Sequence, residues 1–419
     1  MFFCLMTAYF IIKPLRDEMG IAGGVRNLPH LYLFTLGSML LLAPLFGWAT
    51  RGRKREDFLP LVYRFFGVHL LGFFLALRFL PESDPWLGRV FYVWTAVFNL
   101  FCLSLFWGFM ADGLGFRRGR RVIGVVAVGG TSGAILGSVI TDLLVGSLGR
   151  IPLLLVSLVF LELTVQCVRP LSKRFYRLRE GDEPTPQPSI VPSRPSIVAG
   201  IQLVLKSPYL QAICAFLVLY SLSSTFLYLA QANIVAAAEN GRIARAQLLA
   251  RIEVWVQTTT LITQLTLTGR VLKRVGSGPV LAALPIVTGL GFVALGLWPG
   301  LLVLVVVQVM RRTLNYALTK PARESLYTPL RPDAQYQAKS FIDTFVYRGG
   351  DAMGATSYDV LTGLGLGISG IAFAAVPLCM VWALVAVHLG RRQRAMADGR
   401  MNTDPAAPPT VDAIVRSSP

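Results

Sequence analysis

Long apolar stretches recur from one end of the chain to the other, and they restrict its fold more than any other feature of the sequence. Two examples are LYLFTLGSMLLLAPLFGWA (31–49) and LLVLVVVQV (301–309). A helix needs about 20 mostly apolar residues to cross the hydrocarbon core of a membrane. Hydrophobic residues make up 54% of the 419 residues and charged ones only 15%, whereas about 25% is usual in soluble domains. The sequence therefore predicts an all-α polytopic membrane protein.

Counting these stretches predicts twelve transmembrane helices in two six-helix bundles. The predicted spans are residues 1–24, 29–49, 58–80, 87–111, 122–145, 151–168, 208–238, 251–270, 279–298, 300–319, 340–364 and 367–389. Six helices, a linker and six helices is the layout of the major facilitator architecture. The loop FGWATRGRKRED (46–57) is similar in part to a loop signature of that superfamily, with Thr50 where the usual residue is Asp. Arg53 in this loop is a predicted gating residue.

Composition divides the chain into four parts. Residues 1–168 and 208–390 are the two predicted bundles. The segment 169–207 between them is basic and rich in Pro and Ser. Because such a composition cannot bury enough apolar surface to fold, it is predicted to be a cytoplasmic linker. Residues 391–419 are predicted to be a disordered cytoplasmic tail.

The net charge of +18 on its own is typical of proteins that bind nucleic acids. Most Lys and Arg, however, fall in alternate loops, and this asymmetry marks the cytoplasmic side of a membrane protein. It predicts that both termini lie in the cytoplasm. No basic face is interleaved with aromatic residues, as single-strand binding requires, so no nucleic-acid partner is predicted. Arg far outnumbers Lys, as in GC-rich bacterial genomes, which favours a bacterial inner membrane.

Residue types that carry catalysis or bind metals are scattered along the chain. The five Cys stand singly inside apolar stretches, without CxxC spacing, and the three His are equally isolated. The Cys residues are predicted to be small buried hydrophobes. His69 lies within a predicted span and is predicted to be a satisfied core histidine, with a polar residue of a solute pathway as the alternative. The sequence contains no recognisable nucleophile–base pair, metal-ligand cluster or Walker motif. It therefore predicts neither an enzyme nor a bound cofactor.

Four charged residues stand together inside the first predicted helix, in IIKPLRDEMG (11–20). They follow the apolar run, whereas a signal peptide carries its charge before it. An ionisable residue within a span costs about 2.5–3.5 kcal/mol, so it usually faces a partner or a watery pathway. Lys13 and Asp17 are four residues apart and are predicted to pair. Arg16 points elsewhere and is predicted to face a hydrated cavity, where its guanidinium suits a phosphate-bearing solute.

Further cations lie inside the predicted spans of the second half: Arg311 and Arg312 in 300–319, and Arg348 in 340–364. These exceed what packing needs and predict an anion site between the two halves. Other interior charges have a plainer explanation. Arg64 and Glu162 are predicted to pair with neighbouring residues and lock the bundle, and Asp142, Glu253 and Asp359 near helix ends are predicted to reach out to the interface.

Four glycines in GVVAVGGTSGAILG (124–137) are predicted to let the fifth helix approach a neighbour closely, a common use of small residues in membranes. They are Gly129, Gly130, Gly133 and Gly137. A phosphate-binding loop is the rival explanation. It is disfavoured because no strand precedes the glycines and no GK[ST] follows them.

Three stretches resemble the ATP/ADP translocases of plastids and obligate intracellular bacteria. IIKPLRDEMG (11–20) is similar to the family's first helix, SLFWGFMAD (104–112) to its fourth, and the long stretch from Leu314 to Gly350 to its tenth and eleventh. The resemblance implies a twelve-helix carrier that exchanges ATP for ADP. Of the family's four functional charges, only the first-helix lysine keeps its sign here, at Arg16.

The other three family charges fall near neutral or opposite residues of this chain. Two glutamates correspond to positions near Thr95 and Ala230, and a lysine to a position near Asp351. The resemblance therefore implies a more neutral pocket, lined in part by Thr95, Asn99 and Gln231. The segment after Pro321 has two explanations: Lys320, Arg323 and Glu324 form a gate together with Arg53, or they are a solvated loop surface.

The sequence thus predicts a monomeric, alternating-access transporter in the lipid bilayer with a small anionic substrate, for which a nucleotide is the leading candidate. The predicted binding residues are Lys13, Arg16, Asp17, Thr95, Asn99, Gln231, Arg311, Arg312, Arg348 and Asp351. One alternative is a proton- or ion-coupled facilitator or exporter of another organic solute, with Asp17, Glu18 or Asp351 carrying the proton. Another is a membrane scaffold or lipid scramblase, which predicts no solute flux.

Overall fold

The computed structural model describes residues 1–49, 55–80, 85–180 and 197–397. Within these ranges the chain is helical apart from short connections and contains no strand. The helices before the predicted linker are α1 (Phe2–Ala22), α2 (Leu28–Ala49), α3 (Arg55–Phe79), α4 (Pro85–Leu148), α5 (Pro152–Gln166) and α6 (Val168–Glu180). The short 3-10 helix Val25–Asn27 joins α1 to α2.

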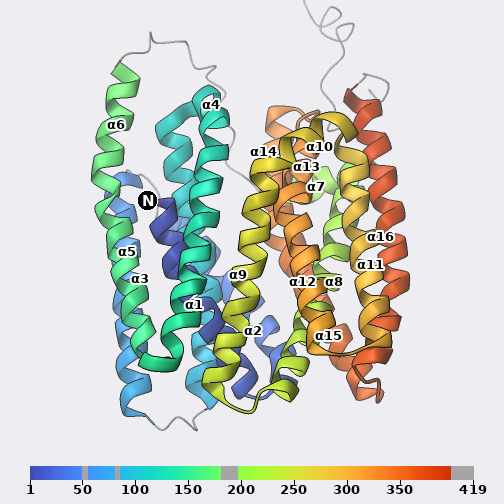
Figure 1. Cartoon of the computed structure of the whole chain (residues 1–419). Helices are drawn as coiled ribbons and strands as arrows, with labels where there is room; N and C mark the ends of the chain where they lie inside the picture. The colour runs from blue at the N-terminus through green and yellow to red at the C-terminus, as the bar shows by residue number, and fades with distance from the viewer. Residues whose placement is uncertain (50–54, 81–84, 181–196, 398–419) are drawn as a thin grey trace, which may run out of the picture. The chain divides into compact units, whose positions relative to one another are not determined.

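The remaining helices follow in the order shown by the colours of Figure 1. They are α7 (Ile197–Lys206), α8 (Pro208–Ala238), α9 (Arg242–Thr266), α10 (Thr268–Val275), α11 (Ser277–Leu297), α12 (Leu301–Leu314), α13 (Lys320–Glu324), α14 (Pro332–Phe341), α15 (Tyr347–Gly363) and α16 (Ile368–Ala397). A π-helical turn at Asn315–Thr319 separates α12 from α13, and another at Ile342–Val346 separates α14 from α15.

Eight helical segments of the described chain are long and apolar enough to cross a membrane. They are Glu56–Phe79, Pro85–Leu114, Gly124–Leu148, Pro152–Arg177, Pro208–Ala238, Ser277–Leu297, Leu301–Tyr327 and Ile368–Met396. The predicted class, an all-α multi-pass membrane protein, is confirmed. The other four predicted spans fall on α1, α2, α9 and α15. Four charges in α1 set it apart from an ordinary apolar span.

The structure divides into two compact units. Unit 1 comprises Met1–Thr185 and Gln231–Leu261, and unit 2 comprises Pro186–Ala230 and Ile262–Pro419. The hairpin formed by the end of α8 and most of α9 therefore packs with the helices that precede the predicted linker. Sequence order gives no sign of this exchange, because the hairpin lies well inside the second half of the chain.

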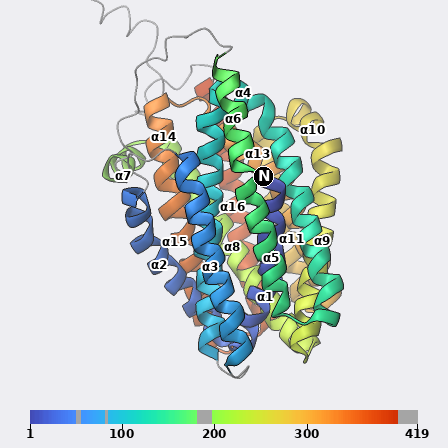
Figure 2. The same cartoon turned by 90° about the vertical axis from the view of Figure 1, so that its left-hand side faces the viewer.

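Helices occupy both ends of the predicted linker, which composition marks as unstructured. α6 continues to Glu180 and buries Phe175 against Phe109, with the ring centroids 5.4 Å apart. α7 lies against α14 (Figure 2). Apolar residues at helical spacing among the charges explain this difference. α16 extends to Ala397, into the predicted tail. Residues 181–196 and 398–419 lie outside the described residues.

In unit 1, α1 packs against α4 and α5, and α3 packs against α5 (Figures 1 and 2). α4 contains two candidate spans, Pro85–Leu114 and Gly124–Leu148, and both pack against α1. The two spans run in opposite directions. Phe2 stacks on Phe106 at 4.4 Å while Met19 lies against Gly88, so the first span is antiparallel to α1. Gly133 meets Phe3 and Gly137 meets Thr7, so the second span is parallel to it.

The predicted close approach of the glycine-rich helix is confirmed at three of four positions. A Cβ atom would lie 2.1 Å from the Phe2 ring at Gly130, 2.2 Å from the Phe3 carbonyl oxygen at Gly133 and 2.5 Å from the Thr7 carbonyl oxygen at Gly137. Gly129 has no neighbouring atom within 4 Å, so its predicted role was wrong. The close contacts also let the Thr7 hydroxyl donate to the Gly133 carbonyl at 3.1 Å.

Replacing Gly133 with Ala is therefore expected to destabilise the protein by roughly 1–3 kcal/mol, the usual cost of overpacking. The atom that the new methyl group meets is a backbone oxygen, which cannot rotate away. The Gly129→Ala variant is the matched control, since its methyl group meets open space. Apparent melting temperatures of the purified proteins in detergent measure both effects. Equal melting temperatures for the two variants would contradict the close packing of α1 and α4.

Unit 2 is built around α11 and α16, which lie side by side in Figure 1. Their backbones come close together at Gly278 and Gly390, where a Cβ atom on Gly390 would lie 2.5 Å from the Gly278 Cα. Large buried side chains fill the centre of this unit, among them Trp382, Tyr209 and Phe216. This packing surrounds the polar residues of α8, α12 and α15 described below.

Candidate functional site

Lys13 of α1 is paired with Glu253 of α9, inside unit 1. Their Nζ and Oε1 atoms are 2.5 Å apart, and the two side chains are 14% and 5% exposed. The predicted Lys13–Asp17 pair is therefore wrong, and so is the expectation that Glu253 reaches out to the interface. The pair is separated by 240 positions in the sequence, which is why helical spacing alone selected the nearer carboxylate.

Arg16 is neutralised by its neighbour Asp17, contrary to the expectation that it stands apart from α1 carboxylates. Its Nε atom donates to Asp17 Oδ1 at 2.9 Å, and both side chains are largely buried. The guanidinium also lies over the ring of Tyr92 on α4, with its carbon 4.7 Å from the ring centroid. Cation–π contact of this kind orients a guanidinium. The α1 arginine is thus held in place by a carboxylate and an aromatic ring.

The three predicted neutral lining residues also belong to unit 1. Thr95 is fully buried on α4, and its hydroxyl donates to the Phe91 carbonyl at 2.8 Å. Asn99 is half-buried one turn further along α4, and Gln231 is buried on α8. Their place in one pocket stays a prediction.

Arg311 of α12 is the most unusual of the predicted site residues. It is 3% exposed, and its Nε and Nη2 atoms have no hydrogen-bond partner among the described residues. No carboxylate of the described chain pairs with it. Its guanidinium carbon lies 5.7 Å from the ring centroid of Tyr220, whose hydroxyl accepts a 2.9 Å bond from Asn315. A buried charge is costly unless it is paired, and this guanidinium lacks such a partner among the described residues.

Arg348 and Asp351 of α15 form a second charged group in unit 2. Arg348 Nη1 donates to Asp351 Oδ2 at 3.3 Å, and the Asp351 carboxylate also accepts hydrogen bonds from Ser221 and, at 3.5 Å, from Thr225. Arg348 lies 5.7 Å from the ring centroid of Tyr347.

Aromatic rings connect the two groups of unit 2. The rings of Tyr347 and Tyr220 are 5.9 Å apart, so the neighbours of Arg348 and Arg311 contact one another. Arg312 lies over the ring of Tyr316 at 5.8 Å and is half-buried. Both π-helical turns flank these arginines in sequence. Such turns are frequent at functional sites. Unit 2 thus brings Arg311, Arg348 and Asp351 into one polar and aromatic region.

The predicted gating residues lie on α13, apart from Arg53, which is outside the described residues. Glu324 is exposed and pairs with Lys339 of α14 at 2.5 Å, while Lys320 is exposed and Arg323 half-buried. Three other interior charges are now placed. Arg64 and Glu162, each predicted to pair with a neighbour, pair with each other at 2.9 Å, but both are exposed. Asp142, predicted to reach out to the interface, pairs with Arg251 at 2.8 Å.

Glu18 organises a charged cluster that the sequence did not predict. Its carboxylate is completely buried and accepts bonds from Arg150 at 2.9 Å and from Arg242 at 3.2 Å. Arg245 lies 3.7 Å away. One carboxylate of α1 therefore ties the α4–α5 connection to the start of α9. The only sequence signal was a charge next to Asp17, since the three arginines resemble ordinary loop and helix-end charges.

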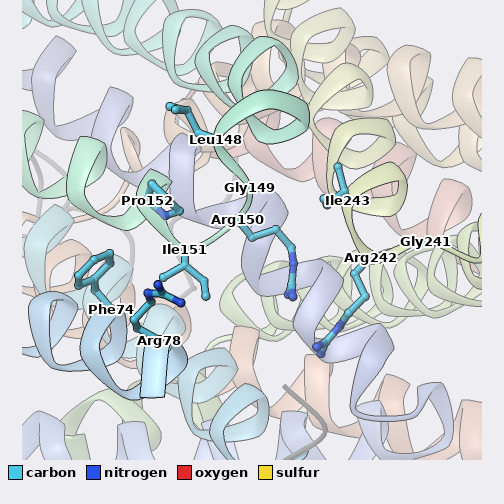
Figure 3. A pocket seen from close by; sticks show the side chains of 10 residues that line it. All are labelled: Phe74, Arg78, Leu148, Gly149, Arg150, Ile151, Pro152, Gly241, Arg242 and Ile243. Atoms are coloured by element: carbon cyan, nitrogen blue, oxygen red, sulfur yellow. The ribbon is translucent and has the colours of Figure 1, made fainter. Parts of the chain in front are cut away.

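An open hollow adjoins this cluster within unit 1 (Figure 3). It has a volume of about 650 Å³ and is lined by Phe74, Arg78, Leu148, Gly149, Arg150, Ile151, Pro152, Gly241, Arg242 and Ile243. Three arginines reach it from different elements: Arg78 from the last turn of α3, Arg150 from the α4–α5 connection and Arg242 from the start of α9. We call it the arginine hollow.

Comparison with solved structures places this arrangement in a known fold. One similar structure is a mutant of the nucleoside transporter NupG, with a TM-score of 0.55, 12% identity, and coverage of 94% of this chain and 96% of that one. Another is an auto-inhibited peptide transporter of the POT family, with a TM-score of 0.61, 13% identity, and coverage of 98% of both chains.

These likenesses confirm the predicted major facilitator-like fold and, at such low identity, the fold alone. No protein-family model and no curated protein sequence matches the chain. The resemblance to ATP/ADP translocases therefore stays a hypothesis.

Proposed function

We propose that the protein is a secondary transporter that moves an organic anion across the membrane by alternating access. The observation that carries this proposal is the buried Arg311 guanidinium, which has no carboxylate partner among the described residues. The fold is shared with a nucleoside transporter and a peptide transporter. A fold shared with solute transporters, together with an interior cation that has no carboxylate partner in the described part of the chain, favours an anionic substrate.

A nucleotide exchanged in the manner of ATP for ADP is the leading substrate. Phosphate groups need cations with fixed donors, and Arg311 and Arg348 supply them in unit 2. Tyr220 and Tyr347 lie beside these arginines and offer faces on which a base can stack. The sequence resemblance supports the same substrate through Arg16. The proposed setting is a bacterial inner membrane, with both termini in the cytoplasm and the carrier acting as a monomer.

Exchange by reconstituted protein is the direct test. We expect proteoliposomes containing the full chain to take up external labelled ATP when they are loaded with ADP, and to take up very little when they are empty. Excess unlabelled ATP should inhibit the uptake of labelled ATP by a carrier, whereas it would not affect a leak. Absence of counter-nucleotide dependence would reject nucleotide exchange. Protein-free vesicles loaded with ADP provide the baseline.

A proton- or ion-coupled facilitator or exporter of another organic solute is the second candidate. The neutralisation of the α1 cations favours it, because Lys13 is paired with Glu253 and Arg16 with Asp17. A neutral lining suits a solute with less charge than a nucleotide. In this case Asp17, Glu18 or Asp351 carries the coupled proton. Uptake that depends on a pH gradient and ignores internal ADP would support this candidate over exchange.

A further inference from the structure

The arginine hollow gathers positive charge where the helices of unit 1 end. Candidate spans end at Phe79, Leu148 and Ala238, and another begins at Pro152; the lining residues belong to these ends and to the connections between them. In a membrane-spanning protein such ends lie at the level of the lipid headgroups. The hollow therefore faces the membrane–water interface.

The charged residues that line the hollow, within the part of the chain that the structure describes, are all arginines: Arg78, Arg150 and Arg242. Glu18 accepts bonds from Arg150 and Arg242, and Arg150 is only 7% exposed. Clustered guanidinium groups in a partly desolvated site attract an anionic ligand.

The size and lining of the hollow indicate what kind of anion it fits. Sites for organic ligands typically measure about 300–1,000 Å³, and the hollow has about 650 Å³, far more than a simple inorganic ion fills. Its apolar lining has two parts: Figure 3 shows Phe74 and Ile151 beside Arg78, and Ile243 on the other side, beside Arg242. Basic pockets between transmembrane helices are known to bind phospholipid headgroups. Arginine forks match phosphate oxygens geometrically.

We propose that the arginine hollow is a binding site for an organic phosphate, the phosphate group resting on the arginines and the organic part on the apolar lining residues. Two sources share this chemistry, a phospholipid headgroup and a soluble phosphate ester. The site is distinct from the region around Arg311, and a binding measurement tests it whether or not the protein carries nucleotides.

The test uses the purified full chain in a neutral detergent, with melting followed by intrinsic fluorescence. The probes are dihexanoyl phosphatidylglycerol, its zwitterionic phosphatidylcholine counterpart, and glycerol phosphate. A ligand that binds the folded state raises the melting temperature as its concentration increases. We expect phosphatidylglycerol or glycerol phosphate to do so at lower concentration than phosphatidylcholine. A response to phosphatidylglycerol alone identifies the lipid as the source, and a response to both identifies the phosphate ester.

Arg78→Gln is the decisive variant, because Arg78 is exposed and makes no described contact with Glu18. We expect it and Arg242→Gln to weaken binding by about tenfold or more, the loss typical of one charge-assisted hydrogen bond. Arg251→Gln is the matched control. Arg251 lies on α9, like Arg242, but it pairs with Asp142 outside the hollow. The proposal is overturned if no phosphate probe raises the wild-type melting temperature, or if Arg251→Gln weakens binding as much as Arg78→Gln.

Discussion

Replacing Glu18 with Gln is expected to lower the melting temperature of the purified protein sharply. The carboxylate is completely buried and holds Arg150 and Arg242, with Arg245 close by. Gln keeps the shape but removes the charge, so the three guanidinium groups then repel one another in a site from which water is largely excluded. Removing one partner of a buried ion pair costs about 3–5 kcal/mol. Thermal melting in detergent measures the loss.

The control for Glu18→Gln is Glu162→Gln. Glu162 also pairs with an arginine of unit 1, but both partners are exposed, so its loss is expected to leave the melting temperature close to that of the wild type. A double variant, Glu18→Gln with Arg242→Gln, is expected to recover part of the stability because it removes one of the repelling charges. A Glu18→Gln protein as stable as the Glu162→Gln protein would show that the cluster does not tie the elements together.

The fold was largely predictable because membrane insertion imposes a strong pattern on the sequence. Apolar stretches of spanning length located the helices, and small residues located the tight contact of Gly133 with α1. The linker ends were harder. The charge-rich composition of the segment 168–180 predicted an unstructured linker. It gave no weight to the single residue Phe175, which is buried where α6 meets α4. A few well-placed apolar residues suffice to hold such a helix in place.

The site was less predictable, because ion pairs form between residues that are close in the folded structure, whatever their separation in the sequence. Sequence reasoning correctly marked Lys13, Arg16 and Arg311 as interior residues. It could not foresee that Glu253 reaches Lys13 from a hairpin 240 residues further along the chain. For the same reason, Arg150 and Arg242 looked like ordinary charges near helix ends until the structure brought them to Glu18. The sequence shows which charged residues would be costly to bury, but it does not show which residue pairs with each of them.

Replacing Arg311 with Met is expected to abolish most ATP-for-ADP exchange while leaving the protein as stable as the wild type or more so. Losing a buried charged partner costs a ligand about 2–5 kcal/mol, and about 1.4 kcal/mol corresponds to tenfold, so exchange should fall by roughly a hundredfold. Stability is expected to be unchanged or higher, because the guanidinium is buried without a carboxylate partner among the described residues. Met fills similar volume without that desolvation cost.

This opposition between activity and stability separates a binding role for Arg311 from a structural one. A structural arginine predicts a lower melting temperature in the Arg311→Met protein, with exchange reduced only as far as folded protein is lost. Arg270→Met is the matched control, since Arg270 belongs to the same unit but is exposed. Arg311→Lys keeps the charge but not the planar fork, so partial exchange in that variant would show that donor geometry matters as well as charge. Full exchange by the stable Arg311→Met protein would remove the main support for an anion site in unit 2.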